Sequence, residues 1–249
     1  MTQIAQPAFS APSDVTPHFA VPATAFGADT SRCPQRMLEM AKLRWGGESD
    51  LWVFGYASLI WRPEFDFIEQ RRAKVHGWHR SLKMWSRINR GTPDCPGLVF
   101  ALLSGGCCHG VVFRVARHDV AEVLPRLWQR EMATGVYDPK WLHCQTDQGP
   151  VHALAFTLSR RSPNFTGELS DVRYREIFSS AVGRYGSSLD YAQQTLQELQ
   201  RHAIHDAALA RLIRLAAEEV AAGTDGGAAA MRLYNESSSN SSNPDQEPS

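Results

Sequence analysis

The chain has 249 residues, in which 26 Lys and Arg side chains balance 26 Asp and Glu side chains. Because the charges cancel and are mixed along the chain, no broad basic field is available to recruit nucleic acid or an anionic membrane. We therefore expect neither among its partners. The apolar content of 43% is ordinary for a globular protein with one core.

The two ends differ in composition from the middle. Residues 1–31 are rich in Pro, Ala, Ser and Thr without apolar periodicity, and from residue 223 the chain turns to Gly and Ala and then to Ser and Asn. We expect disorder over 1–31 and 223–249, and one folded domain over 32–222. Arg32 is the first basic residue and no apolar segment precedes it, which predicts no secretion signal. The five cysteines contain no CxxC pair, so we expect reduced thiols and a cytoplasmic location. We also expect a monomeric chain.

Strand patterns dominate the first part of the chain after a short helix. The stretch from Cys95 to Phe113 has no charged residue, but its glycines favour two strands around a Ser104-Gly105-Gly106 turn over a membrane span. In chain order, the pattern predicts a helix over Pro34–Trp45, a strand over Leu51–Ala57, two strands over Arg72–Trp78 and Ser81–Trp85 around Gly77, the hairpin strands Leu98–Leu103 and Cys107–Val115, and a strand over Val151–Leu158.

Helical patterns lie mostly in the later part. They cover His118–Met132, Asp171–Val182 with Val172 on the apolar side, Leu189–Leu199 and His205–Ala221. Strands early and helices late predict an α+β fold. No GxGxxG segment and no Walker loop occurs, so we expect no nucleotide site and no cofactor.

Glu131 is the most informative single residue. The apolar positions 120, 123, 124, 127 and 128 predict position 131 as the next one on the buried side of its helix. Burial raises the pKa of a carboxyl group, which suits a residue that accepts and returns a proton near neutral pH. The alternative is an ion pair with Arg130 or Arg126. Pro125 adds a second uncertainty, because proline inside a helix removes a hydrogen bond and bends or shortens the helix.

The turn after the first strand is the second candidate feature. Small residues follow Phe54-Gly55, and consecutive backbone N–H groups in such a turn form a concavity that binds anions. The hydroxyl group of Ser58 adds a further donor. The alternative is an ordinary strand-to-loop transition.

The cysteines give weaker signals. Cys107, Cys108 and His109 are consecutive, and neighbours on a strand point to opposite faces, so they do not chelate one metal ion well. We expect no metal site. Cys108 as a nucleophile lacks an identifiable base, and a buried structural thiol is the simpler interpretation.

Several of these segments together resemble a known family. Residues Trp52–Trp61 read WVFGYASLIW, similar to the WVFGYGSLIW signature of ChaC-type γ-glutamylcyclotransferases. Leu127–Tyr137 read LWQREMATGVY, similar to the bacterial block LWxREMxTGxY. The resemblance runs from about residue 50 to residue 200, and between these two blocks it includes Gly77–Arg80, Arg90–Pro93 with Pro96-Gly97, and Gly110–Val115.

The resemblance implies a compact γ-glutamylcyclotransferase-like β-barrel with flanking helices. It implies conversion of glutathione to 5-oxoproline and Cys-Gly without metal or cofactor, with Glu131 as the general acid and base. It assigns the γ-glutamyl group to the turn formed by Tyr56, Ala57, Ser58 and Leu59, and implies that Tyr137 and Tyr191 help to hold the substrate. Arg80 and Arg90 are candidates to attract the glycine carboxylate, with rim ion pairs as the alternative.

Two positions depart from the family pattern. Ala57 stands where the family has glycine, which matters only if that position has positive φ. Ser188 stands in place of the asparagine of GTNxxYL, which weakens the assignment of Tyr191. Three rival functions stay open: a cyclotransferase for another γ-glutamyl amine or dipeptide, a non-catalytic γ-glutamyl-binding protein, and a cysteine-dependent amidohydrolase.

Overall fold

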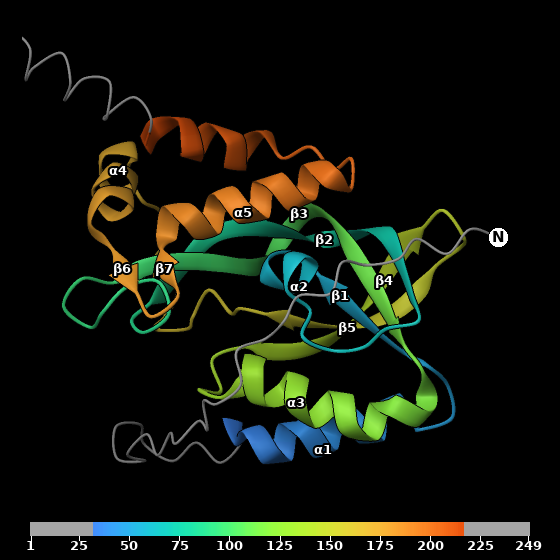
Figure 1. Ribbon diagram of the computed structural model, residues 1–249. Helices are drawn as coiled ribbons and strands as arrows, with labels where there is room; N and C mark the ends of the chain where they lie inside the picture. The colour runs from blue at the N-terminus through green and yellow to red at the C-terminus, as the bar shows by residue number, and fades with distance from the viewer. Residues whose placement is uncertain (1–31, 217–249) are drawn as a thin grey trace, which may run out of the picture.

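The computed structural model describes residues 32–216 (Figure 1). The predictions for 1–31 and for 223–249 lie outside the described residues, as does the end of the predicted helix His205–Ala221. Within the described range, residues 207–216 are helical. No helix in this range is long and apolar enough to cross a membrane.

Five strands form a closed barrel. In chain order they are β1 (Leu51–Gly55), β2 (Glu69–Ser86), β3 (Gly97–Val115), β4 (Asp138–Thr146) and β5 (Val151–Thr157), and their order around the barrel is β1-β3-β2-β4-β5. Parallel pairing of β1 with β5, with Trp52 opposite Ala153, closes the barrel. The barrel with flanking helices confirms the predicted α+β class.

The predicted hairpin between residues 98 and 115 is wrong. These residues form one strand, β3, which pairs with β2 in antiparallel fashion from Glu69↔Arg114 to Ser86↔Gly97. The two strands predicted around Gly77 are likewise one strand. Gly77, Gly105 and Gly106 have positive φ, as a turn would require, but they face each other across a register shift. Glycine is needed here because the paired strands bend sharply as they follow the barrel.

Strand β4 was not predicted from the sequence. It pairs with β5 from Asp138↔Thr157 to Cys144↔Val151 and with β2 at Ala73↔Thr146. Its start, directly after Tyr137, lies beside the end of β5, where Asp138 pairs with Thr157.

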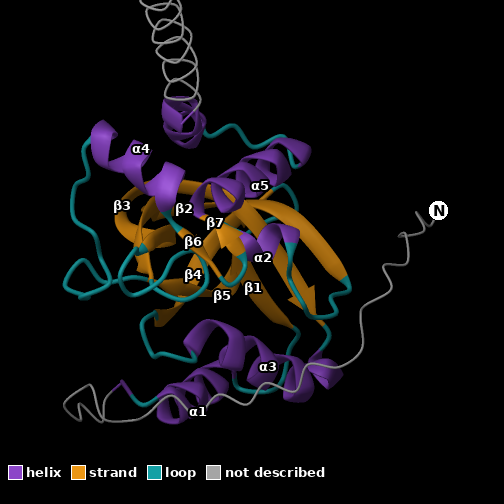
Figure 2. Cartoon of the chain, turned by 60° about the vertical axis from the view of Figure 1, so that its left-hand side comes forward, coloured by secondary structure: helices purple, strands orange, loops and turns teal. Residues whose placement is uncertain are grey.

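Helices cover the barrel on two sides (Figures 1 and 2). Helices α1 (Pro34–Trp45) and α3 (Val120–Met132), the latter preceded by the short 3-10 helix Arg117–Asp119, lie side by side on one face. On the other face lie α4 (Asp171–Ser180), the small hairpin β6 (Val182–Gly183) and β7 (Gly186–Ser187), α5 (Ser188–Arg201) and the helical residues 207–216. The one-turn helix α2 (Ser58–Trp61) follows β1 and contacts α5.

The helix predictions hold with two corrections. Helix α3 is continuous through Pro125, and Val120, Val123, Leu124, Leu127 and Trp128 are buried as the periodicity predicts. Helix α4 ends at Ser180, not Val182, because Val182 begins β6. Val172, predicted on its apolar side, is exposed.

Candidate active site

Glu131 lies at the barrel-facing end of α3. Its side chain is 14% exposed, and Arg130 Nε lies 3.0 Å from its Oε1. Burial raises the pKa of Glu131 above its ordinary value, while the positive charge of Arg130 opposes the shift and Glu64 adds to it. Both interpretations of the sequence therefore hold together: Glu131 is a buried carboxyl group, and it has an arginine partner. A carboxyl group with a raised pKa exchanges protons more readily near neutral pH.

Arg130 connects the carboxyl group to the turn after β1. It donates hydrogen bonds to the carbonyl oxygens of Arg62 and Pro63, pairs with Glu64 Oε2 at 3.0 Å, and reaches Ser58 Oγ at 3.4 Å. This connection was not predicted, because residues 58–64 and 130 are far apart in the chain and no local pattern links them. The contacts fix the position of Glu131 relative to Ser58.

The turn from Tyr56 to Leu59 leads from β1 into the one-turn helix α2. Ala57 precedes α2 with φ of −147°, so the alternative of positive φ at this position is excluded. The carbonyl of Ala57 accepts from Ile60 N and that of Ser58 accepts from Arg62 N, each at 2.8 Å. The amides of Ser58 and Leu59 lie in the first turn of α2, where no helical carbonyl precedes them.

Three tyrosines surround the carboxyl group. Tyr56 and Tyr191 are buried and Tyr137 is half-buried. Burial raises the pKa of Tyr56 and Tyr137 well above the ordinary value and that of Tyr191 to about 12, and the negative charge of Glu131 raises all three further. The structure thus brings these predicted residues into one electrostatic cluster. All three hydroxyl groups stay protonated near neutral pH and remain able to donate and accept hydrogen bonds.

Tyr56 is fixed from two sides. Its hydroxyl group donates to the carbonyl of Phe156 in β5 at 3.0 Å, and its own carbonyl accepts from Arg80 Nη1 at 2.9 Å. Arg80 in turn forms an ion pair with Asp206 at 2.6 Å, with side-chain exposures of 5% and 15%. Arg80 therefore links the turn to Asp206, directly before the helical residues 207–216. These contacts agree with the ion-pair interpretation of Arg80 and not with a substrate contact.

Tyr191 is held firmly despite the loss of the family asparagine. Ser187 caps the N-terminus of α5 in a capping box, in which its side chain accepts from Asp190 N and Asp190 accepts from Ser187 N. The buried Ser188 accepts from Leu98 N at 2.7 Å and donates to the carbonyl of Arg90. Serine thus ties the start of α5 to the barrel, one helical turn before Tyr191.

The cysteines show no sign of nucleophilic activation. Cys107 is exposed and Cys108 is buried, as expected for neighbours on a strand. Burial raises the pKa of the Cys108 thiol to about 11. The thiolate, which is the nucleophilic form, is therefore scarce near neutral pH, which argues against a cysteine-dependent amidohydrolase. Within residues 32–216, no His, Cys, Asp and Glu side chains form a group of three or more that could hold a metal ion.

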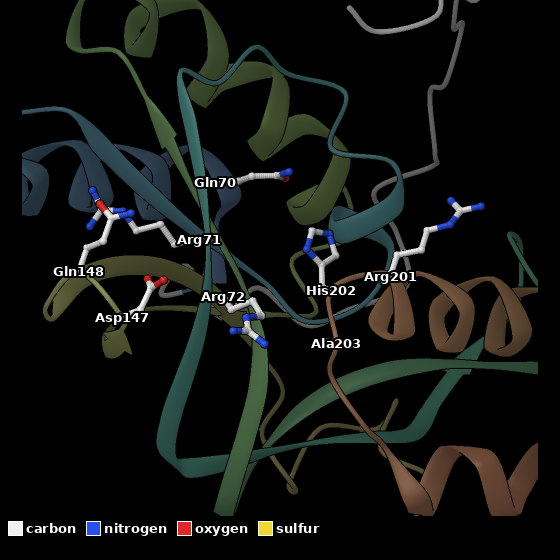
Figure 3. A pocket seen from close by; sticks show the side chains of 8 residues that line it. All are labelled: Gln70, Arg71, Arg72, Asp147, Gln148, Arg201, His202 and Ala203. Atoms are coloured by element: carbon white, nitrogen blue, oxygen red, sulfur yellow. The ribbon is translucent and has the colours of Figure 1, made fainter. Parts of the chain in front are cut away.

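Two open hollows on the described surface lie away from Glu131. The first has a volume of about 480 Å³ and lies between β2, the β4–β5 turn and the end of α5 (Figure 3). Figure 3 shows Arg71 and Arg72 on one side of it and Arg201 and His202 on the other. Arg71 is paired with Glu69 and lies over the Trp52 ring. The second, of about 450 Å³, is lined by residues that include Trp45, Trp52 and Trp141. None of the predicted site residues lines either hollow.

Comparison with known proteins agrees with the motifs and the barrel. A family model described as ChaC-like protein matches residues 51–219. The chain belongs to the ChaC-like family. The glutathione-specific γ-glutamylcyclotransferase of Escherichia coli strain K12 is 33% identical over 167 residues, which cover 67% of this chain and 72% of that protein. The human glutathione-specific γ-glutamylcyclotransferase 1 is 31% identical over 151 residues, which cover 59% of this chain and 68% of that protein.

A solved structure shares the ChaC-like fold seen here. The crystal structure of a glutathione-specific γ-glutamylcyclotransferase from yeast superposes with a TM-score of 0.62 and 21% identity, covering 69% of this chain and 97% of that one. The likeness confirms the predicted γ-glutamylcyclotransferase-like fold. In this ChaC-like chain Glu131, Tyr56, Ser58, Tyr137 and Tyr191 meet at one place, although they come from α3, α2, α5 and the ends of two strands.

Proposed function

We propose that this chain is a glutathione-specific γ-glutamylcyclotransferase, which converts glutathione to 5-oxoproline and Cys-Gly. Membership of the ChaC-like family and the names of its relatives support the reaction. The observation that carries the assignment to a site is the buried Glu131 carboxyl group, with a raised pKa, among Tyr56, Tyr137 and Tyr191.

The reaction needs no group beyond the substrate and a proton carrier. The α-amine of the γ-glutamyl residue attacks its own γ-carbonyl carbon, and the bond between that carbon and the cysteine nitrogen breaks. Such an intramolecular attack, held in the right geometry, reaches effective molarities on the order of 10⁵–10⁸ M. Glu131 takes the proton from the α-ammonium group and delivers it to the departing nitrogen. In all, the attacking nitrogen loses two protons as the ammonium group becomes the lactam N–H, the departing nitrogen gains two as it becomes the ammonium group of Cys-Gly, one C–N bond forms and one breaks.

The turn and the tyrosines hold the reacting arm. The amides of Ser58 and Leu59 donate to the α-carboxylate or to the oxyanion that develops on the γ-carbonyl. The hydroxyl groups of Tyr137 and Tyr191 orient the γ-glutamyl group beside Glu131. Ala57 permits this role because its φ is negative.

The test is incubation of the full chain with glutathione, with 5-oxoproline and Cys-Gly measured separately. We expect the two products in equal amounts, and γ-Glu-Ala to be a poor substrate. Efficient turnover of γ-Glu-Ala would favour the rival cyclotransferase of other γ-glutamyl dipeptides. Glutathione binding in calorimetry without either product would favour a non-catalytic γ-glutamyl-binding protein.

Three further properties belong to this proposal. The folded unit spans residues 32–222, the chain acts as a monomer, and it works in the cytoplasm. Limited proteolysis, light scattering and cell fractionation test these points in turn.

A further inference from the structure

Arg90 is an unusual arginine close to the candidate site. It lies between β2 and β3 and is 6% exposed. Within residues 32–216 no carboxylate forms an ion pair with it, and its burial lowers its pKa. Buried charges are costly unless they are paired, so an arginine kept here without an acid indicates a partner that arrives from outside.

Half of the guanidinium group has no acceptor in the described protein. Nη1 donates to the carbonyl oxygens of Tyr185 and Ser187, the latter at 3.4 Å. Nε and Nη2 donate to no residue in the range 32–216. No fully buried side-chain nitrogen or oxygen in this range lacks a partner, so Nε and Nη2 face accessible space. An Nε–Nη2 edge is the side of arginine that binds a carboxylate through two parallel hydrogen bonds.

The backbone holds this edge in place before any ligand binds. The Arg90 amide donates to Ser86 Oγ at 3.0 Å, and its carbonyl accepts from Ser188 Oγ at 3.3 Å. Gly97 and Gly183 pack directly on the segment: a Cβ on Gly97 would lie 1.9 Å from Arg90 O, and one on Gly183 would lie 2.5 Å from Arg90 N. Such a fixed donor pair loses little entropy when it binds.

The surroundings of Arg90 favour an anion and link it to the site. Its guanidinium carbon lies 5.0 Å from the centroid of the Tyr191 ring, and the charge of Arg62 adds to its own. Asp190 is the nearest described acid that acts on Arg90, and its carboxylate already accepts from Ser187 N. Asp190 therefore offsets part of the positive charge of Arg90 without forming an ion pair with it.

The position of Arg90 distinguishes between the two carboxylates of glutathione. Tyr191 interacts electrostatically with both Glu131 and Arg90, whereas the charges that act on Glu131 are those of Arg130 and Glu64. Arg90 is thus not among the charges that act on Glu131, although it acts on the neighbouring Tyr191. The α-carboxylate shares a carbon atom with the attacking amine and must stay beside Glu131. The glycine carboxylate lies up to about 7 Å beyond the scissile nitrogen, since each extended residue spans about 3.5 Å.

We propose that Arg90 binds the glycine carboxylate of glutathione and thereby selects Cys-Gly as the leaving group. This inference rests on the proposed function and deepens it, because it assigns the specificity for the part of the substrate that does not react. Arg80, the other candidate of the sequence, is excluded because Asp206 and two backbone carbonyls already occupy its donors.

The test compares glutathione with its ethyl ester at the glycine carboxyl group, for the wild type and for Arg90→Met. We expect the wild type to favour glutathione by about 10- to 100-fold in kcat/KM, as for loss of a charge-assisted hydrogen bond. Arg90→Met should lower kcat/KM for glutathione by a similar factor and leave that for the ester nearly unchanged. Arg90→Lys keeps the positive charge but lacks the two parallel donors of a guanidinium group, so it should retain part of the preference for glutathione over the ester. Arg87→Met is the matched control, because Arg87 is exposed and donates only to Asn164 among the described residues.

Three results would overturn the inference. One is equal use of both substrates by the wild type, which needs no variant to fold. The second is an equal loss for both substrates in Arg90→Met, as a purely structural role predicts. The third is equal binding of glutathione and ester to Glu131→Gln in calorimetry, which measures recognition without turnover. Failure of the proposed function is distinct, because the wild type would then make no 5-oxoproline.

Discussion

Arg130 Nε lies 3.0 Å from Glu131 Oε1, although the two residues are neighbours on one helix, and the same guanidinium group reaches Ser58 Oγ at 3.4 Å. One arginine therefore sets both the ionisation of the carboxyl group and its distance from the turn that follows β1. The proposed acid–base residue and the proposed binding turn are parts of one connected unit.

Loss of the arginine should change the pH dependence of the reaction. The charge of Arg130 lowers the pKa of Glu131 against the effect of burial, so Arg130→Met should raise that pKa further. Because Glu131 must be ionised to accept a proton, the acidic limb of the kcat/KM profile should move to higher pH. Arg126→Met is the control, since Arg126 pairs with Glu122 on the solvent side of the same helix. An unmoved limb in Arg130→Met would contradict the role of its charge.

The buried carboxyl group should also reduce stability at neutral pH. The pKa of Glu131 is raised in the folded state above the ordinary value of 4.5. The folded chain then binds more protons than the unfolded chain between these two values, so stability falls as pH rises through this window. Glu131→Gln should therefore have a higher Tm than the wild type above the folded pKa, and the difference should shrink toward pH 4. A Tm difference that does not depend on pH would refute the buried, raised-pKa carboxyl group.

The alanine in the turn should be nearly neutral for activity. Ala57 has φ of −147°, so the turn does not require the positive φ that glycine adopts most readily. Ala57→Gly should leave turnover equal or slightly higher and lower the free energy of unfolding by about 0.5–1 kcal/mol, through the greater freedom of the unfolded chain. Ala181→Gly, at a buried site with φ of −83°, reports the cost of the same change away from Glu131. A large loss of turnover in Ala57→Gly alone would contradict this description of the turn.

The ion pair between Arg80 and Asp206 should affect the stability of the protein and not its choice of substrate. Arg80→Met leaves Asp206 without its partner at 15% exposure, which should cost about 3–5 kcal/mol of unfolding free energy in urea titration. The double variant Arg80→Met/Asp206→Asn removes the unpaired charge and keeps an acceptor for Leu209 N, so part of the loss should return. The preference for glutathione over its ethyl ester should persist in both. No recovery in the double variant would contradict the ion-pair account.

The site was more predictable from the sequence than the barrel. The apolar stripe of α3 placed Glu131 on the buried side because a helix repeats every 3.6 residues whatever it packs against. The glycines Gly77, Gly105 and Gly106 predict turns, but positive φ occurs in a hairpin turn and in a bend of paired strands equally. Only the pairing register of β2 with β3 distinguishes a bend from a hairpin turn, and that register depends on residues far apart in the chain.

Strand β4 and the contacts of Arg130 and Arg90 could not be predicted from local sequence patterns. Strand β4 begins Asp138-Pro139-Lys140, a segment poor in β-branched residues, and it becomes a strand by pairing with β5 and β2. The bridge from Arg130 to residues 58–64 and the free edge of Arg90 depend on chain segments that meet only in the fold. Sequence pattern could name these residues without giving their partners.

The most direct test is the rate of 5-oxoproline formation from glutathione by Glu131→Gln. Glutamine keeps the shape of the side chain and removes the proton acceptor, so the rate should fall by about 10²–10⁴-fold while glutathione still binds in calorimetry. Glu122→Gln, at an exposed position on the same helix, should retain the wild-type rate. A folded Glu131→Gln chain that forms 5-oxoproline at the wild-type rate would contradict the account.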